Sequence, residues 1–156
     1  MTVKQRYPLV VTSNCGYPLD QNIYQAVKGI AAAANIARDD GAILLCAECA
    51  DGFAGHRHFA EIMRQGETAA DVLKWIAAQP ETVIDQWQAQ ILAQILIRVP
   101  VYVYSAMPAG QLREIKMYPL EDPGDFFEQR INRMYNKEVN IAILPLGFQT
   151  VPTEKN

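Results

Sequence analysis

The sequence has neither a long hydrophobic stretch nor an excess of basic residues. No apolar segment reaches the about 18 residues that a membrane-spanning helix needs. The first residues, MTVKQRYPLVVTSN, lack the apolar core and small-residue cleavage site of a secretory signal peptide. Lys and Arg number 14 against 17 Asp and Glu, which gives a net charge of -3, whereas nucleic-acid-binding proteins usually carry a basic surface. We therefore expect a cytoplasmic protein that binds neither membranes nor nucleic acid.

Cysteines are few, and phosphate-binding loops are absent. Three cysteines, an odd number, do not indicate a disulfide framework. Half of the 156 residues are hydrophobic, which is enough for one domain to fold around an apolar core. Neither G-x-x-x-x-G-K-S/T nor G-x-G-x-x-G occurs, so no motif is present that would hold a nucleotide phosphate independently.

Apolar, β-branched segments alternate with segments of helical periodicity. Strands are expected at Tyr7–Ser13, Ala42–Cys46, Val101–Ser105 and Val139–Leu144. A helix follows the first strand, with Asp20 as its N-cap, and between Glu48 and Gly66 an irregular loop, ECADGFAGHRH, leads into a short helix. Further helices are expected at Thr68–Ala78, Glu81–Ile97, Ala109–Lys116 and Gly124–Tyr135.

This alternation predicts an α/β fold with three layers. Strands that are separated by helices form an open, mostly parallel sheet with helices on both faces, which is a Rossmann-like arrangement. We expect one domain over residues 1–148 and a polar C-terminal tail over residues 149–156.

The segment TSNCGYPLDQNIYQAVK, residues 12–28, joins the first strand to the first helix and holds the candidate site, because ligands in open α/β sheets gather beyond the C-terminal ends of strands. The core face of the helix is expected to carry Ile23, Val27, Ile30 and Ala34. Tyr24 and Lys28 lie one turn apart on a flank, with Gln25 further round. An ammonium, an amide and a phenol could hold a small carboxylate. They could equally be ordinary amphipathic surface residues.

Three segments of the chain resemble the C-terminal domain of the nickel-pincer lactate racemase family. They are TSNCGYPLDQNIYQAVKGIAAAA (residues 12–34), ECADGFAG (residues 48–55) and DQWQAQILAQIL (residues 85–96). Members of this family are longer than this chain: an N-terminal domain holds the nickel-pincer nucleotide and the histidines, and the C-terminal domain closes over the substrate. The resemblance therefore implies a substrate-closing domain of a 2-hydroxy-acid (lactate) racemase.

The resemblance also assigns the site residues. Tyr24, Gln25 and Lys28 match the family's tyrosine, glutamine and lysine that face the substrate and cofactor, and Trp87 matches its pocket-wall tryptophan. By this match, Lys28 orients the substrate carboxylate or hydroxyl and Gln25 hydrogen-bonds it. Tyr24 and Trp87 pack around the substrate and exclude water. From the residues alone, Trp87 could also be a helix-packing residue.

The chain lacks the metal-binding and proton-transfer set that the resemblance implies. Its only two histidines, His56 and His58, lie in one tripeptide, so an acid and a base cannot be placed on opposite faces of a substrate. We expect no catalytic residue, no metal ligand and no bound cofactor in the isolated chain. An N-terminal racemase domain, in cis or in trans, is the expected partner, and the chain alone is expected to be inactive.

Two alternatives remain open. Cys46 and Cys49 form a C-x-x-C, with His56 and His58 shortly after, so a stand-alone zinc-binding or redox module is possible. Against it, Cys46 completes an apolar strand and can be a small core hydrophobe, and a loop follows where a thioredoxin-like motif needs a helix. The second alternative is a diverged domain that keeps the fold and serves only as an interaction partner.

Overall fold

The computed structural model of the chain describes residues 2–3, 5–134, 139–151 and 153–154. Five parallel strands form the main sheet in the order β5-β4-β3-β2-β6, and β1 and β7 form a separate parallel pair. The strands are β1 (Thr2–Val3), β2 (Tyr7–Ser13), β3 (Ala37–Cys46), β4 (Val101–Tyr104), β5 (Tyr118–Leu120), β6 (Ile141–Leu144) and β7 (Thr153–Glu154). The helices are α1 (Ile23–Ala34), α2 (Arg57–Met63), α3 (Ala69–Ala77), α4 (Gln86–Arg98), α5 (Ala109–Glu114), α6 (Pro123–Met134) and the 3-10 helix η1 (Gly147–Gln149).

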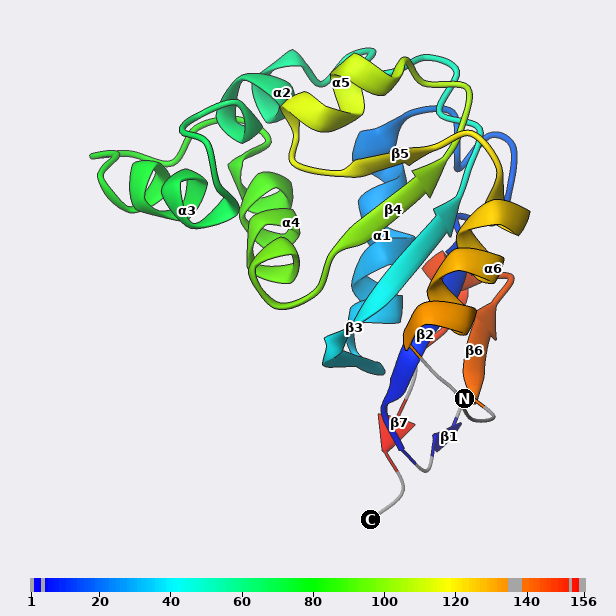
Figure 1. Cartoon of the computed structure of the whole chain (residues 1–156). Helices are drawn as coiled ribbons and strands as arrows, with labels where there is room; N and C mark the ends of the chain where they lie inside the picture. Colours follow the sequence, from blue (N-terminus) through cyan, green and yellow to red (C-terminus); the bar gives the residue numbers. More distant parts are fainter. Residues whose placement is uncertain (1, 4, 135–138, 152, 155–156) are drawn as a thin grey trace.

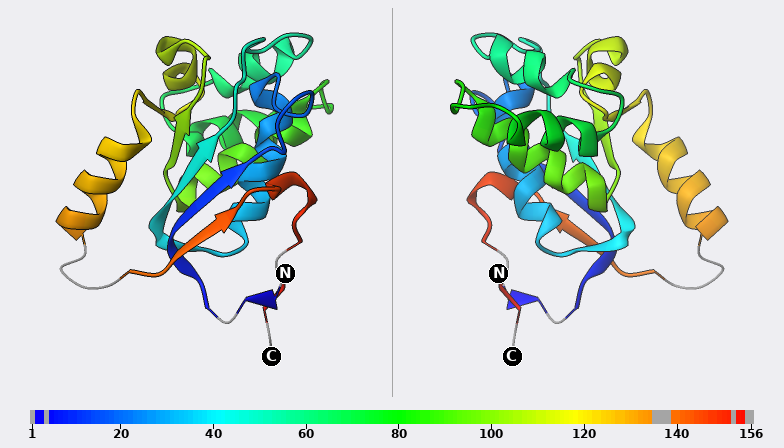
Figure 2. Two further views of the ribbon diagram at one scale, coloured as in Figure 1. Left: turned by 90° about the vertical axis from the view of Figure 1, so that its right-hand side faces the viewer. Right: turned by 90° about the vertical axis from the view of Figure 1, so that its left-hand side faces the viewer.

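Helices cover both faces of the main sheet (Figure 1). Helices α1 and α4 lie on one face, with α2 and α3 packed against α4, and α6 lies across the opposite face (Figure 2). The predicted three-layer α/β fold with a parallel sheet is confirmed.

The core sits on both sides of the two central strands, β2 and β3. Val10, Ile43 and Leu45 are fully buried and face the main core beneath α1. On the other face, Leu44 packs in a second cluster with Phe126 of α6. Burial on both faces explains why these strands read as continuous apolar runs, as is usual in parallel sheets.

Strand β3 begins earlier than the sequence predicted, at Ala37 where Ala42 was expected. Its first residues include an exposed stretch, 38–40, that is polar and carries no hydrophobic signal. Gly41 lies inside the strand, where the register with β2 shifts. A Cβ at Gly41 would come within 2.7 Å of the Pro8 carbonyl oxygen, so the close approach of the two backbones there requires glycine.

Helix α4 begins later than predicted, at Gln86 where Glu81 was expected. Asp85, immediately before it, has φ 63 and ψ 0, a left-handed conformation that cannot belong to a right-handed helix. Helix α3 matches its prediction closely, because Thr68 and Asp71 form a capping box at its start. The Pro-containing strand β5 was not predicted, since its three residues give no alternating pattern.

The C-terminal segment expected as a polar tail contains secondary structure. Its first residue, Gln149, ends η1, and β7 pairs with β1 in parallel register, Thr2 opposite Thr153. Residues 152, 155 and 156 of the expected tail, and Tyr135 of the expected last helix, lie outside the described residues. Within the described ranges no helix has the length and apolar character to cross a membrane.

Candidate functional site

The candidate site lies at the carboxyl end of β2, where the chain turns into α1. The N-cap of α1 is Asn22, whose side-chain oxygen accepts from the Gln25 backbone N–H at 2.9 Å. The predicted N-cap, Asp20, is wrong: helix α1 starts two residues too late for it, and its carboxylate instead accepts from the Glu48 backbone N–H at 3.2 Å. Asp20 therefore ties the loop after β2 to the loop after β3.

The end of β2 is packed closely against α1 and η1. A Cβ at Gly29 in α1 would come within 2.6 Å of the Ser13 carbonyl oxygen. A Cβ at Gly147 in η1 would overlap the Thr12 hydroxyl, which itself donates to the Gly29 carbonyl at 3.2 Å. These small residues let η1 lie against α1, and this contact brings Phe148 to the flank of the helix that carries Lys28.

Lys28 and Gln25 form the charged side of the site. The Lys28 ammonium donates to the Gln25 side-chain oxygen at 2.6 Å and lies 4.9 Å from the centre of the Phe148 ring. Both side chains are half-buried. No carboxylate of the described residues lies within ion-pairing distance of Lys28. The ammonium thus keeps donors for a ligand, in a place where an aromatic face favours a cation.

Tyr24 forms the aromatic side of the site, and it is buried rather than on an exposed flank, with 6% of its surface accessible. Its ring stacks on His56 with 3.6 Å between ring centroids and 4° between planes. The rings of Phe59, at 5.5 Å, and Trp87, at 6.2 Å, meet it edge-on. Burial raises the pKa of the Tyr24 hydroxyl, and the negative charge of Asp85 raises it further.

Asp85 and His56 support the aromatic side, and the sequence analysis missed this role. His56 Nδ1 lies 3.3 Å from an Asp85 carboxylate oxygen, and the Asp85 side chain is only 10% exposed. The adjacency of Asp85 and Trp87 in the DQWQ segment was a signal that could have pointed to this cluster.

Trp87 lies in the first turn of α4 and is 53% exposed, so it is not a buried packing residue. The next residue, Gln88, is 1% exposed and donates from its amide to the Tyr24 carbonyl at 2.8 Å, which joins α4 to α1. The four predicted residues therefore form two neighbouring pairs: Lys28 bonds to Gln25, and Trp87 packs against Tyr24.

The cysteines and histidines that could have formed a metal or redox module occupy separate environments. His56 pairs with Asp85, and the exposed His58 lies 3.2 Å from Glu61. Burial raises the pKa of Cys46, and burial together with Asp20 raises the pKa of Cys49 to about 12. At neutral pH both thiols are protonated and thus poor nucleophiles and ligands. The described part of the chain contains no group of three or more His, Cys, Asp and Glu that could hold a metal ion.

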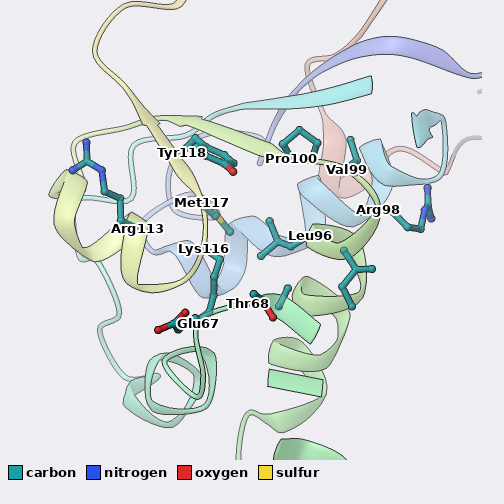
Figure 3. A pocket seen from close by; sticks show the side chains of 12 residues that line it. Glu67, Thr68, Leu96, Arg98, Val99, Pro100, Arg113, Lys116, Met117 and Tyr118 are labelled. Atoms are coloured by element: carbon teal, nitrogen blue, oxygen red, sulfur yellow. The ribbon is translucent and has the colours of Figure 1, made fainter. Parts of the chain in front are cut away.

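Two cavities lie near the two ends of the sheet. One of about 500 Å³ opens at the carboxyl ends of β3 and β4, beside the candidate site, and its lining includes Asp20, Glu48 and Tyr104. The larger, of about 720 Å³, lies at the amino ends of β4 and β5, with an apolar floor that includes Leu96 and Met117 (Figure 3). None of the four predicted site residues lines it, so the larger cavity and the candidate site lie at different places.

The chain is similar in sequence and structure to lactate racemases. A family model described as the lactate racemase C-terminal domain matches residues 3–151. A lactate racemase from Thermoanaerobacterium thermosaccharolyticum is 38% identical over 150 residues, covering 94% of this chain and 35% of the relative. Another from Lactiplantibacillus plantarum is 38% identical over 146 residues, covering 92% of this chain and 34% of the relative.

A solved structure agrees with this assignment. The lactate racemase apoprotein from Thermoanaerobacterium thermosaccharolyticum superposes with a TM-score of 0.88 at 36% identity, covering 97% of this chain and 36% of that structure. The chain spans about a third of the length of the curated relatives it matches. The family model covers nearly the whole chain, and the chain therefore belongs to the lactate racemase C-terminal domain family.

Proposed function

We propose that this chain is the substrate-closing C-terminal domain of a nickel-pincer-dependent 2-hydroxy-acid racemase, with lactate as the expected substrate. It contributes contacts to substrate and cofactor, and an N-terminal domain in cis or in trans supplies the metal and the proton-transfer histidines. Two observations support the partner: the chain matches about a third of each curated relative, and its two histidines are each paired with a carboxylate.

The observation that carries the proposal is the half-buried Lys28 ammonium at the carboxyl end of β2. A 2-hydroxy acid presents a carboxylate and a hydroxyl, and an ammonium attracts the first while an amide can bond the second. Lys28 and Gln25 already contact one another at 2.6 Å, so both can reach one small ligand. Without a carboxylate partner among the described residues, Lys28 needs no ion pair broken before it binds substrate.

Tyr24 and Trp87 supply the apolar part of the wall. Their rings meet edge-on at 6.2 Å, and Trp87 remains half-exposed, which leaves it a surface to cover a ligand or a flat cofactor ring. Covering the substrate with aromatic surface excludes water and strengthens the attraction between Lys28 and the carboxylate.

The residues of this chain fit the periphery of the nickel-pincer nucleotide rather than its metal. Nickel in proteins prefers imidazole and thiolate ligands, whereas this site offers an ammonium, an amide and two aromatic rings. When bound by the partner domain, the cofactor would supply the hydride chemistry of racemisation. In this chain, Gln25 and Lys28 would hold the substrate, and Tyr24 and Trp87 would line the enclosure.

The proposal is tested by supplying a cofactor-loaded N-terminal racemase half to the chain and measuring racemisation of lactate. Changing Lys28→Ala should lower kcat/KM by about 100-fold or more, because a charge-assisted contact to the substrate is worth several kcal/mol once water is excluded. Lys74→Ala is the matched control, since Lys74 is a lysine on exposed α3, 3.2 Å from Asp71. Racemisation that survives Lys28→Ala undiminished contradicts the proposal.

A further inference from the structure

The aromatic side of the site packs beside an almost buried carboxylate, that of Asp85. Asp85 is 10% exposed on its side chain and faces His56 at 3.3 Å. Its negative charge raises the pKa of Tyr24, and the His56 ring covers one face of the Tyr24 ring. A single carboxylate thus pairs with His56 at the start of α2, and the His56 ring stacks on Tyr24 of α1.

The backbone of Asp85 adds a third connection. Its left-handed conformation ends the loop before α4, and its carbonyl accepts from the backbone N–H groups of Gln88 and Ala89 at 3.2 and 3.3 Å. The orientation of the first turn of α4 therefore depends on Asp85, and Trp87 lies in that turn. Gln88, from the same turn, is bonded to the Tyr24 carbonyl at 2.8 Å.

We propose that His56 and Asp85 are positioning residues that hold Tyr24 and Trp87 in the orientation needed to enclose the substrate, before a partner domain arrives. This inference rests on the proposed function. His56 restricts Tyr24 by stacking on its ring, and Asp85 restricts both His56 and the turn that carries Trp87. Neither His56 nor Asp85 needs to touch substrate, so their effect passes through the two rings.

Preorganisation is the physical benefit of such a cluster. An aromatic wall that is already ordered loses little conformational entropy when the substrate binds, and a displacement of about 1 Å can cost on the order of 100-fold in rate. The paired charge of Asp85 also avoids leaving a buried carboxylate without partners, which would destabilise the fold.

Two substitutions remove the pairing of Asp85 with His56, one from each side. Asp85→Asn keeps the size of the side chain and a residue type that tolerates left-handed backbone, but removes the charge. His56→Phe keeps a flat ring against Tyr24 and removes the nitrogen that faces Asp85. His58→Phe is the matched control, because His58 lies in the same tripeptide but is exposed and paired with Glu61.

The first measurement uses the chain alone and needs no cofactor. We expect Asp85→Asn to lower the NMR order parameter of the Trp87 indole N–H from the rigid range near 0.85 to below about 0.6, and to shift the Tyr24 ring protons. His56→Phe should loosen Trp87 to a smaller extent, and His58→Phe should change neither signal. If Asp85→Asn does not fold, His56→Phe provides the same test.

The second measurement adds the cofactor-loaded N-terminal half. Asp85→Asn should lower kcat/KM by about 10- to 100-fold, as expected for a misplaced wall, and His58→Phe should leave it unchanged. Unchanged order of Trp87 and Tyr24 in both variants, or loosening without any loss of racemisation, overturns the positioning role. If Lys28→Ala abolishes racemisation while Asp85→Asn and His56→Phe are silent, only this inference fails. If Lys28→Ala is silent, the proposed function fails first.

Discussion

The two sides of the candidate site are built in opposite ways. On one side, Tyr24 is buried, stacked and bonded, and its neighbours come from two other helices, α2 and α4. On the other, Lys28 reaches Gln25 within its own helix and Phe148 in η1, and it stays half-buried. The comparison indicates that the aromatic side is part of the fold, whereas the charged side can be changed without cost to the fold.

The strongest test of this difference removes a ring from the aromatic side. Phe59 is fully buried and meets Tyr24 edge-on, so Phe59→Ala leaves a cavity beneath the site. We expect the free energy of unfolding to fall by about 3 to 5 kcal/mol, as is usual for a buried Phe→Ala change. Chemical denaturation measures this loss. A fall below about 1 kcal/mol would show that the aromatic side is not part of the core.

A smaller effect is expected where α1 approaches β2. Gly29→Ala places a Cβ 2.6 Å from the Ser13 carbonyl oxygen, which is too close, so α1 must shift. Overpacking of this kind lowers the free energy of unfolding by about 1 to 3 kcal/mol. Gly110→Ala in α5 is the control, because nothing lies within 4 Å of its added Cβ. The control should be neutral or stabilising, by up to about 1 kcal/mol, because alanine favours helices more than glycine.

Alkaline pH should also destabilise the fold through Tyr24 on the aromatic side, by a smaller amount. The pKa of Tyr24 is raised above its ordinary value in the folded chain, first by burial and then by Asp85. The folded state therefore holds this proton more tightly than the unfolded state, and the free energy of unfolding falls as pH rises above about 10. Tyr24→Phe should remove this part of the decrease. Urea denaturation of both proteins between neutral and alkaline pH measures it, and parallel curves would contradict the assignment.

The charged side should show the smallest effect on stability. Lys28→Met keeps the aliphatic length but loses the hydrogen bond to Gln25 and the contact with the Phe148 ring. Because these are partly exposed interactions, we expect the free energy of unfolding to change by no more than about 0.5 kcal/mol. The same variant should fail in racemisation. A loss of stability as large as that of Phe59→Ala would remove the distinction between the two sides.

The sequence predicted the sheet better than the site. Buried strands such as β2 appear as apolar runs because both faces are covered, and Thr68 signals the start of α3 by its capping box. The start of α4 could not be predicted, because neither the left-handed backbone of Asp85 nor the pairing of its carboxylate with His56 leaves a signal in the hydrophobic pattern. Asp20 is of a residue type that often caps helices, but the residue at the N-cap position of α1 is Asn22.

The site residues themselves were assigned from the family resemblance, and helical periodicity indicated only the helix on which Tyr24, Gln25 and Lys28 lie. Periodicity placed Ile23 and Val27 correctly in the core, yet it left Tyr24 on a flank. Helix α1 is covered on more than one side, by the sheet, by α4 and by η1, so a single apolar stripe underestimates its burial. The pairing of His56 with Asp85 spans 29 positions and leaves no periodic signal in the sequence.

The half-exposed indole of Trp87 also gives the chain an intrinsic fluorescence signal for association with a partner domain. A tryptophan that moves from water into an apolar contact emits at shorter wavelength, and the chain contains one other tryptophan, the partly buried Trp75. Titration with an N-terminal racemase half should therefore produce a blue-shifted emission that follows the association directly. The affinity of the two halves could be measured in this way without any attached dye.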